Sequence, residues 1–294
     1  MSDLLVIGDS VLWGQGLIEA HKSANLLAGH LQAELKMVAH SGANIGIRDS
    51  HESLTLFGEV PCSYPTIQEQ IQSYAGATAR VDWVLMNGGI NDVDVRRILN
   101  PLHPQFDLGR NTRKYCGRDM LTLLQQTMAK FPQARVLVVG YFPVLSHQSS
   151  QRGIECLFSA VHGVKFAPIF QPDLFRNALV DHCLRFWKVS TESLQDAVTQ
   201  ANQSAGSARA IFVDSGITEA GAAYAPDSLL WELDPDDPFK AMDEVAPQRH
   251  AACDLVGVNI FQKTQCYLVS TGHPNVAGAA RIAEMCIKAV RTFS

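Results

Sequence analysis

The sequence predicts an α/β fold in which helices cover both faces of a parallel β-sheet. Short, wholly apolar runs alternate along the chain with stretches that have the 3.6-residue periodicity of amphipathic helices. Strands that are apolar throughout, rather than at every second position, are typical of a sheet buried on both faces. The chain has 294 residues, 47% of them hydrophobic, and neither an internal repeat nor a linker divides it. We therefore expect a single domain over residues 1–294.

Apolar runs account for the strands of the expected sheet. They cover residues 4–8, 37–40, 83–86, 135–141 and 210–214. Helical patterns lie between and after them, over residues 24–35, 66–74, 120–131, 173–204 and 276–290. Right-handed crossovers bring the carboxyl ends of all the strands to one edge of the sheet, where the active sites of open α/β sheets lie. Polar residues that directly follow a strand are therefore the candidates for function.

Two stretches, residues 145–205 and 215–252, do not follow the alternation of strands and helices, and we expect them to be insertions. The first opens with a segment rich in large apolar residues, 145–170, which forms either a lid or core packing against the helical region at 173–204. Core packing is the favoured interpretation. The second is loop-like and rich in proline. Long loops inside a compact domain are usually functional, so we expect these insertions to determine the substrate.

Charge and composition exclude several classes of function. The 24 lysines and arginines against 29 acidic residues give a formal net charge of −5, which argues against nucleic-acid binding. The longest apolar run, 136–145, is well short of the ~20 residues that a membrane helix needs. No histidine or cysteine pair has the spacing of a metal site, and the glycines at 14 and 16 do not form a dinucleotide fingerprint. We expect no metal and no cofactor.

The cysteines and the start of the chain bear on location. The first expected strand begins almost at once, with no secretory signal segment before it, so the expected location is the cytoplasm. Cys253 and Cys266 would form a disulfide in an exported protein, or stay reduced as packing thiols in the cytoplasm. We expect reduced thiols, in keeping with the expected location.

Residues with catalytic chemistry follow three of the strands and precede the last helix. Ser10 follows the first strand, Gly42 the second and Asn91 the third, while His273 lies just before the final helix. A serine beside a histidine base is a nucleophile, and a main-chain N–H and an amide NH2 are donors for an oxyanion. Each residue alone also fits an ordinary turn or core position, so the order of all of them carries the signal.

That order resembles the SGNH hydrolases, also called the GDSL esterase/lipase superfamily. The motifs are Gly-Asp-Ser ending at Ser10, Gly42, Gly-x-Asn-Asp around Asn91, and His-Pro-Asn from His273. The resemblance implies a three-layer α/β/α sandwich with a flavodoxin-like parallel sheet and hydrolysis of lipid, small acyl or acetylated carbohydrate esters. It implies Ser10 as nucleophile, His273 as base, and an oxyanion hole made of the N–H groups of Ser10 and Gly42 and the Asn91 side chain.

One position departs from the family pattern. The family carries an acid three residues before the histidine, and this chain has Ser270 there. Three interpretations remain open: neutral groups such as the Ser270 hydroxyl or a main-chain carbonyl orient His273, an acid comes from elsewhere such as the region 215–254, or the enzyme is damaged. The first two are favoured because every other required position is filled.

The expected function is a serine-dependent carboxylic ester hydrolase of the esterase or lipase type, with a Ser10 acyl-enzyme and His273 as base. A carbohydrate O-acetylesterase is the alternative, and a non-catalytic binding protein of the same fold ranks below both. Trp13, Phe158 and Trp231 are candidates for the substrate pocket, with Trp13 preferred because it lies three residues after Ser10. The expected partner is a small-molecule or lipid ester, and contact with a lipid surface and the oligomeric state stay open.

Overall fold

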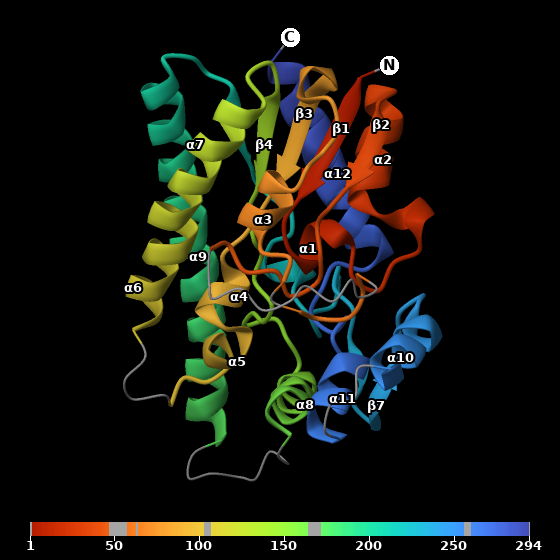
Figure 1. The fold of residues 1–294 in the computed structure, drawn as a ribbon. Helices are drawn as coiled ribbons and strands as arrows, with labels where there is room; N and C mark the ends of the chain where they lie inside the picture. Colours follow the sequence, from red (N-terminus) through yellow and green to blue (C-terminus); the bar gives the residue numbers. More distant parts are fainter. Residues whose placement is uncertain are drawn as a thin grey trace.

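Parallel strands form the central sheet of the molecule, with helices on both of its faces (Figure 1). The computed structural model describes residues 2–46, 58–62, 64–102, 107–163, 172–255 and 260–293. The strands of the sheet are β1 (Asp3–Ile7), β2 (Glu34–Met37), β3 (Val81–Met86), β4 (Arg135–Val139) and β5 (Ala210–Val213). Their order, β2-β1-β3-β4-β5, is that of flavodoxin-like sheets, and the predicted three-layer fold class is confirmed.

Burial of the central strands explains their uniformly apolar sequence. Every neighbouring pair is parallel, and residues 4–7 of β1 are fully buried between β2 and β3. The chain order reverses between β1 and β3, and a crevice opens at such a switch point beyond the carboxyl ends of the strands. The segments that follow β1 and β3 carry Ser10 and Asn91, so the topology brings these two residues to the same crevice.

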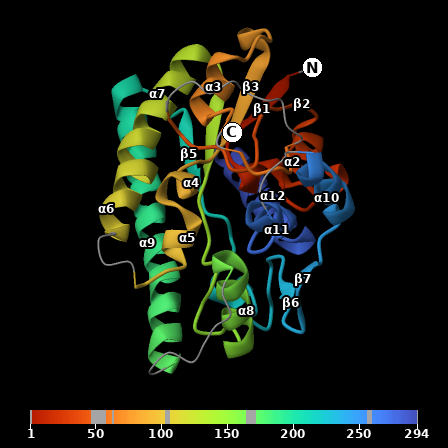
Figure 2. The same cartoon turned by 60° about the horizontal axis from the view of Figure 1, so that its bottom comes forward.

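Two helix layers enclose the sheet. Helices α2 (Ser23–Leu31) and α12 (Val276–Thr292) pack on each other, as do α7 (Met120–Lys130) and α9 (Pro172–Ala205), with α3 (Ile67–Gln72) beside α7. Figure 2 shows the strands between these two layers. Within the described part of the chain, no helix is both long and apolar enough to cross a bilayer.

Shorter elements surround the carboxyl edge of the sheet or link the main layers. The helical ones are α1 (Ser10–Trp13), α4 (Ile90–Val93), α5 (Val95–Ile98), α6 (Leu108–Thr112), the π-helix Arg113–Asp119, α8 (Gln151–His162), α10 (Ala246–Leu255), α11 (Ile260–Tyr267) and the 3-10 turns Glu19–His21, Thr78–Arg80 and Glu219–Gly221. Strands β6 (Leu233–Asp234) and β7 (Asp237–Ala241) form a small antiparallel hairpin. In Figure 1, α8, α10, α11 and β7 lie together below the sheet.

The second strand is where the sequence prediction was wrong. It runs from Glu34 to Met37 rather than over 37–40, and Leu35, assigned to the preceding helix, is part of it. Helix α2 ends at Leu31 because Gln32 takes the left-handed conformation, with φ of 52°. The strand lies at the sheet edge and its residues are half-buried or exposed, so it lacks the apolar run that marks the inner strands.

The insertions are more regular than expected. Within 145–205 the described residues form α8 and α9, and α8 buries Ile154 and Leu157 in the main core, as the core-packing interpretation requires. Residues 164–170 of the apolar segment lie outside the described part of the chain. The loop-like stretch 215–252 contains the β6–β7 hairpin and the first turns of α10.

Candidate active site

Buried hydrogen bonds to the Asp9 carboxylate fix the turn that carries Ser10. Asp9 caps α1, with Oδ1 accepting the Val11 N–H at 2.9 Å. The Asn87 amide donates to the same oxygen at 2.8 Å, and the Tyr141 hydroxyl donates to Oδ2 at 2.7 Å. Burial raises the pKa of Asp9 above its usual range, and these hydrogen bonds act against that rise. The Asp of the Gly-Asp-Ser motif is therefore structural and holds the first turn of α1 in place.

Gly8 is required by the close approach of Asn87, the residue that directly follows β3. Its φ is +150°, and a Cβ there would lie 2.1 Å from Oδ1 of Asn87. The Gln70 side chain binds both main-chain polar groups of Gly8, because the Gly8 N–H donates to Oε1 at 2.7 Å and Nε2 donates to the Gly8 carbonyl at 3.0 Å. The backbone entering Ser10 is thus bound on both sides.

The structure brings Ser10 and His273 together although 263 positions separate them in the chain. Nε2 of His273 lies 2.7 Å from Oγ of Ser10, within hydrogen-bond reach for a base and a nucleophile. The main chain of Trp231 holds the histidine loop, since its N–H donates to the His273 carbonyl at 2.7 Å and its carbonyl accepts from Gly272 at 2.8 Å. Asn275 then caps α12, accepting the Gly278 N–H at 3.0 Å.

His273 is half-buried, and the surroundings of its imidazole keep the ring neutral. Burial lowers its pKa to about 4, and the charge of Arg249 also lowers it, while the main chain at Ser270, Thr271 and Val269 acts in the opposite direction. At neutral pH the ring is therefore in the form that can accept a proton. No described residue makes a hydrogen bond of good geometry to Nδ1. The orienting carboxylate found in a catalytic triad is absent from the described surroundings of this ring.

Ser10, Gly42, Asn91 and His273 all line one cavity of about 600 Å³. Gly42 has φ of +80°, and a Cβ there would lie 2.6 Å from the main-chain nitrogen of Cys62, so no other residue fits. The Asn91 amide donates to the Ala43 carbonyl at 3.0 Å, which orients it. An amide nitrogen has two hydrogens, so the same group has a second donor to offer an oxyanion.

Both apolar and polar side chains line the cavity. Helix α8, the loop after β4 and the turn after α11 contribute Val144, Leu157, Ala160, Val161 and Leu268, which we call the apolar wall. The segments after β2 and β3, with α6, supply the polar side chains, which we call the polar wall and which alternate with apolar residues such as Val93 and Val95: Asn44, Asp92, Asp94, Arg96, Arg97 and Asn111. A ligand with an apolar arm and a polar arm fits such a cavity.

Neither of the tryptophans proposed for the pocket is among the described residues that line the cavity. The Trp13 indole N–H donates to Oε1 of Glu59 at 2.9 Å, and Nζ of Lys22 lies 3.7 Å from the centroid of its ring. Trp231 acts through its main chain, which anchors the loop of His273. Closeness to Ser10 in the sequence therefore does not place Trp13 among the described residues that line this cavity.

Phe158 is likewise not among the described lining residues. Its ring packs edge-on against Phe175 of α9, with centroids 5.2 Å apart. Its neighbours on α8, namely Leu157, Ala160 and Val161, line the cavity instead. Helix α8 thus lines the cavity through a face that does not include Phe158, because Phe158 packs on α9, and sequence reasoning did not resolve which face this is.

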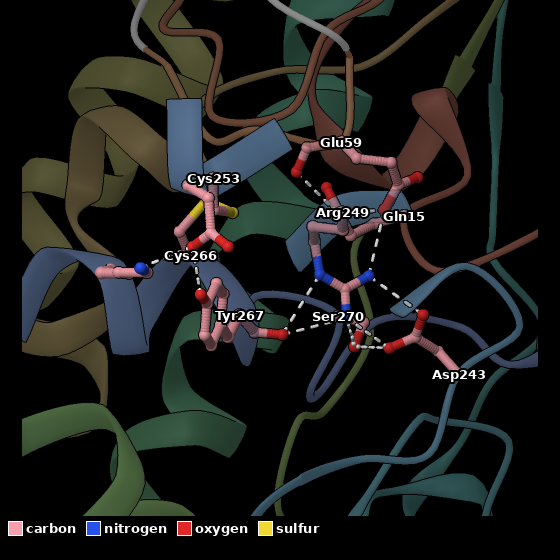
Figure 3. The surroundings of a disulfide bond; sticks show 10 residues. Gln15, Glu59, Asp243, Arg249, Cys253, Cys266, Tyr267 and Ser270 are labelled. Carbon is pink, nitrogen blue, oxygen red and sulfur yellow. Dashed lines mark hydrogen bonds and ion pairs between the residues drawn. A yellow bond between two sulfur atoms is a disulfide. The ribbon is translucent and has the colours of Figure 1, made fainter. Parts of the chain in front are cut away.

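The hydroxyl of Ser270 is turned away from the imidazole. Oγ donates to Oδ2 of Asp243 at 2.5 Å and accepts from Nη2 of Arg249 at 3.3 Å (Figure 3). Its carbonyl, in contrast, accepts the main-chain N–H of His273 at 2.9 Å. Asp243 lies in the region 215–254 that was considered as an outside source of the acid, but its carboxylate binds Ser270 and Arg249 rather than the ring. Sequence reasoning missed Arg249 and Glu59, its second carboxylate partner.

Cys253 and Cys266 are joined in a disulfide, so the expectation of two reduced thiols is wrong. Helices α10 and α11 pack side by side and bring the two Cα atoms to 6.1 Å, within the range that a disulfide spans. The bond closes a loop just upstream of the histidine. In the described part of the chain, no group of three or more His, Cys, Asp or Glu residues has the arrangement of a metal site.

No protein-family model and no curated protein sequence matches this chain. Solved structures, in contrast, do match this chain. Phospholipase A1 from Streptomyces albidoflavus NA297 matches over 100% of this chain and 99% of its own, with a TM-score of 0.52 and 14% identity. An extracellular lipase from Streptomyces rimosus matches over 100% of both chains, with a TM-score of 0.53 and 13% identity. The chain thus has the same fold as these two enzymes, which agrees with the predicted fold class.

Proposed function

We propose that the protein is a serine-dependent carboxylic ester hydrolase of the SGNH type. The observation that carries this proposal is the 2.7 Å contact between Ser10 Oγ and His273 Nε2 at the wall of a cavity. The lowered pKa of His273 is compatible with it, because the ring is unprotonated at neutral pH and Nε2 can accept the Ser10 proton. The shared fold with a phospholipase and a lipase agrees with it.

The reaction proceeds in two steps. In the first, Oγ of Ser10 attacks the ester carbonyl while Nε2 of His273 takes the hydroxyl proton. The N–H groups of Ser10 and Gly42 and the amide of Asn91 stabilise the oxyanion. The C–O bond to the alcohol then breaks, and the alcohol leaves with the proton from His273. In the second step His273 takes a proton from water, the hydroxide attacks the acyl-enzyme, and the acid departs as Ser10 regains its proton.

The amphipathic cavity favours an ester with an apolar acyl group and a polar alcohol. The apolar wall on α8 fits the acyl chain, while the polar wall with Arg96, Arg97 and Asn111 fits the alcohol. That polar wall also keeps the alternative open, a carbohydrate O-acetylesterase in which the sugar occupies it.

Substituting the two reactive residues tests the proposal. Ser10→Ala and His273→Ala should each abolish hydrolysis of a soluble p-nitrophenyl ester, with turnover at least about 1,000-fold below the native protein. Thermal melting shows whether each variant is folded. Native turnover in folded Ser10→Ala contradicts the proposal, and a native protein with no turnover on any ester favours a binding protein of the same fold.

A further inference from the structure

The side chain of Arg249 is fully buried and lies close enough to His273 for its charge to lower the pKa of the imidazole. Arg249 is 0% exposed and contacts two carboxylates: Nη1 lies 3.2 Å from Oε2 of Glu59, and Nη2 lies 2.5 Å from Oδ2 of Asp243. The side chains of the two acids are 2% and 0% exposed. Nε and Nη2 also donate to the Tyr267 carbonyl, at 3.2 and 3.0 Å (Figure 3). Burying a charged side chain costs free energy unless its hydrogen-bond donors find acceptors, and the donors of Arg249 find them here. We call Arg249, its two carboxylate partners Glu59 and Asp243, and the Tyr267 carbonyl the Arg249 cluster.

One end of this cluster is bound to the turn that follows the nucleophile. Glu59 accepts the indole N–H of Trp13 at 2.9 Å, the amide of Gln15 at 2.6 Å and the main-chain N–H of Gly16 at 3.2 Å. These residues lie three to six positions after Ser10, on α1 and its exit turn. The Glu59 carboxylate therefore joins the nucleophile segment to Arg249.

The other end is bound to the histidine loop. The Ser270 hydroxyl donates to Asp243 and accepts from Arg249, and the Ser270 carbonyl accepts the N–H of His273. The position that carries an acid in the family pattern thus links the loop to the ion cluster. A continuous chain of contacts runs from the nucleophile turn through Glu59 and Arg249 to the loop that bears the base.

The residues along this chain of contacts are closely packed. Gly16 has φ of +83°, and a Cβ there would lie 2.9 Å from Cβ of Asp243 and 3.0 Å from Cβ of Ser270. The disulfide adds a covalent constraint, since Cys253 lies one helical turn after Arg249 and Cys266 directly precedes Tyr267. The donor and the acceptor of the Arg249–Tyr267 hydrogen bonds are thus fixed to each other (Figure 3).

We propose that Arg249, held by Glu59 and Asp243, is a positioning residue that sets the approach of His273 to Ser10. It takes the place of a carboxylate bonded to the imidazole: the loop is held through Ser270 rather than the ring through Nδ1. None of the residues of the cluster is among the described residues that line the cavity, so the cluster acts on turnover and not on substrate binding. This inference rests on the proposed hydrolase function.

Arg249→Lys tests the inference, with Arg209→Lys as its matched control. Lysine keeps the charge but lacks the planar fork that serves both carboxylates and the carbonyl. Arg209, which directly precedes β5, also makes several hydrogen bonds, to the carbonyls of Met128, Phe131, Pro132 and Ala134. We expect kcat for a soluble ester to fall by about 10- to 100-fold in Arg249→Lys with KM within about twofold, because a small misplacement of a reacting group costs this much. Arg209→Lys should lower the melting temperature and keep kcat.

Ser270→Ala provides a second arm that disturbs folding less. It removes the contact between the cluster and the histidine loop, so kcat should fall while KM stays. The double variant with Arg249→Lys should be no slower than Arg249→Lys alone, since both act through one connection. If Arg249→Lys does not fold, the kcat and KM of Ser270→Ala alone test the positioning role of Arg249.

The outcomes separate this inference from the function on which it rests. Native kcat in folded Arg249→Lys or Ser270→Ala overturns the positioning role, as does a rise in KM without a loss of kcat. In both cases an inactive Ser10→Ala protein leaves the hydrolase function standing. Native turnover in Ser10→Ala overturns the function itself, and the inference with it.

Discussion

At the scale of single residues, the burial of His273 has the most direct consequence for activity. Its pKa is lowered to about 4, chiefly by burial and further by Arg249. Below that pH the ring is protonated and cannot take the Ser10 proton, so kcat/KM should stay level down to about pH 5 and fall as the pH drops through about 4. The pH profile of kcat/KM for a soluble ester measures this. An acid limb near 6.5, the value of an unperturbed histidine, would contradict the account.

The motif residues of the candidate site could be predicted from sequence because each follows a strand or precedes a helix. Ser10, Gly42, Asn91 and His273 all line the cavity, as their positions on the sheet edge required. The cluster of Arg249 could not be predicted, since Glu59, Asp243 and Arg249 belong to separate segments without common spacing. Trp13 points elsewhere because α1 ends after one turn and directs the indole to Glu59.

At the scale of elements, the disulfide is a covalent link between α10 and α11, in addition to hydrogen bonds and a ring contact between them. The bond closes a loop of 13 residues, and such a cross-link stabilises a protein by about 2–4 kcal/mol. The double variant Cys253→Ser/Cys266→Ser should therefore lose about that much free energy of unfolding in urea, and a reductant should shift the native protein toward the variant. The variant serves as its own control because reductant should leave it unchanged. A native unfolding curve that is insensitive to reductant contradicts the prediction.

β1, β3, β4 and β5 were predicted to within two residues at either end because each contains an unbroken run of four apolar residues. This holds for β1, β3 and β4 inside the sheet and for β5 at one of its edges. The sequence of β2, at the other edge, has no such run, because Glu34 and Lys36 interrupt it. The hairpin β6–β7 was read as loop, because a two-residue strand with proline in its partner carries no periodicity.

At the scale of the whole molecule, segments spread along the chain line the cavity. The residues of this lining predict which acyl chain length of an ester the protein prefers. Ala160→Phe on α8 fills the apolar wall, so kcat/KM for p-nitrophenyl octanoate should fall about tenfold while that for the acetate stays within about twofold. Gln151→Phe adds the same ring at an exposed position of α8 and should change neither. Equal loss on both esters contradicts the acyl assignment, and a native preference for acetate over octanoate favours the O-acetylesterase alternative.

The central claim is that Ser10 is the activated nucleophile of the site, and a fluorophosphonate probe tests it without knowledge of the natural substrate. The probe bonds covalently to a serine that a neighbouring base activates. Peptide mass mapping of the labelled native protein should locate one adduct, on Ser10, and labelling should disappear in His273→Ala. An adduct on another serine, or a folded native protein that takes no label, would contradict the account.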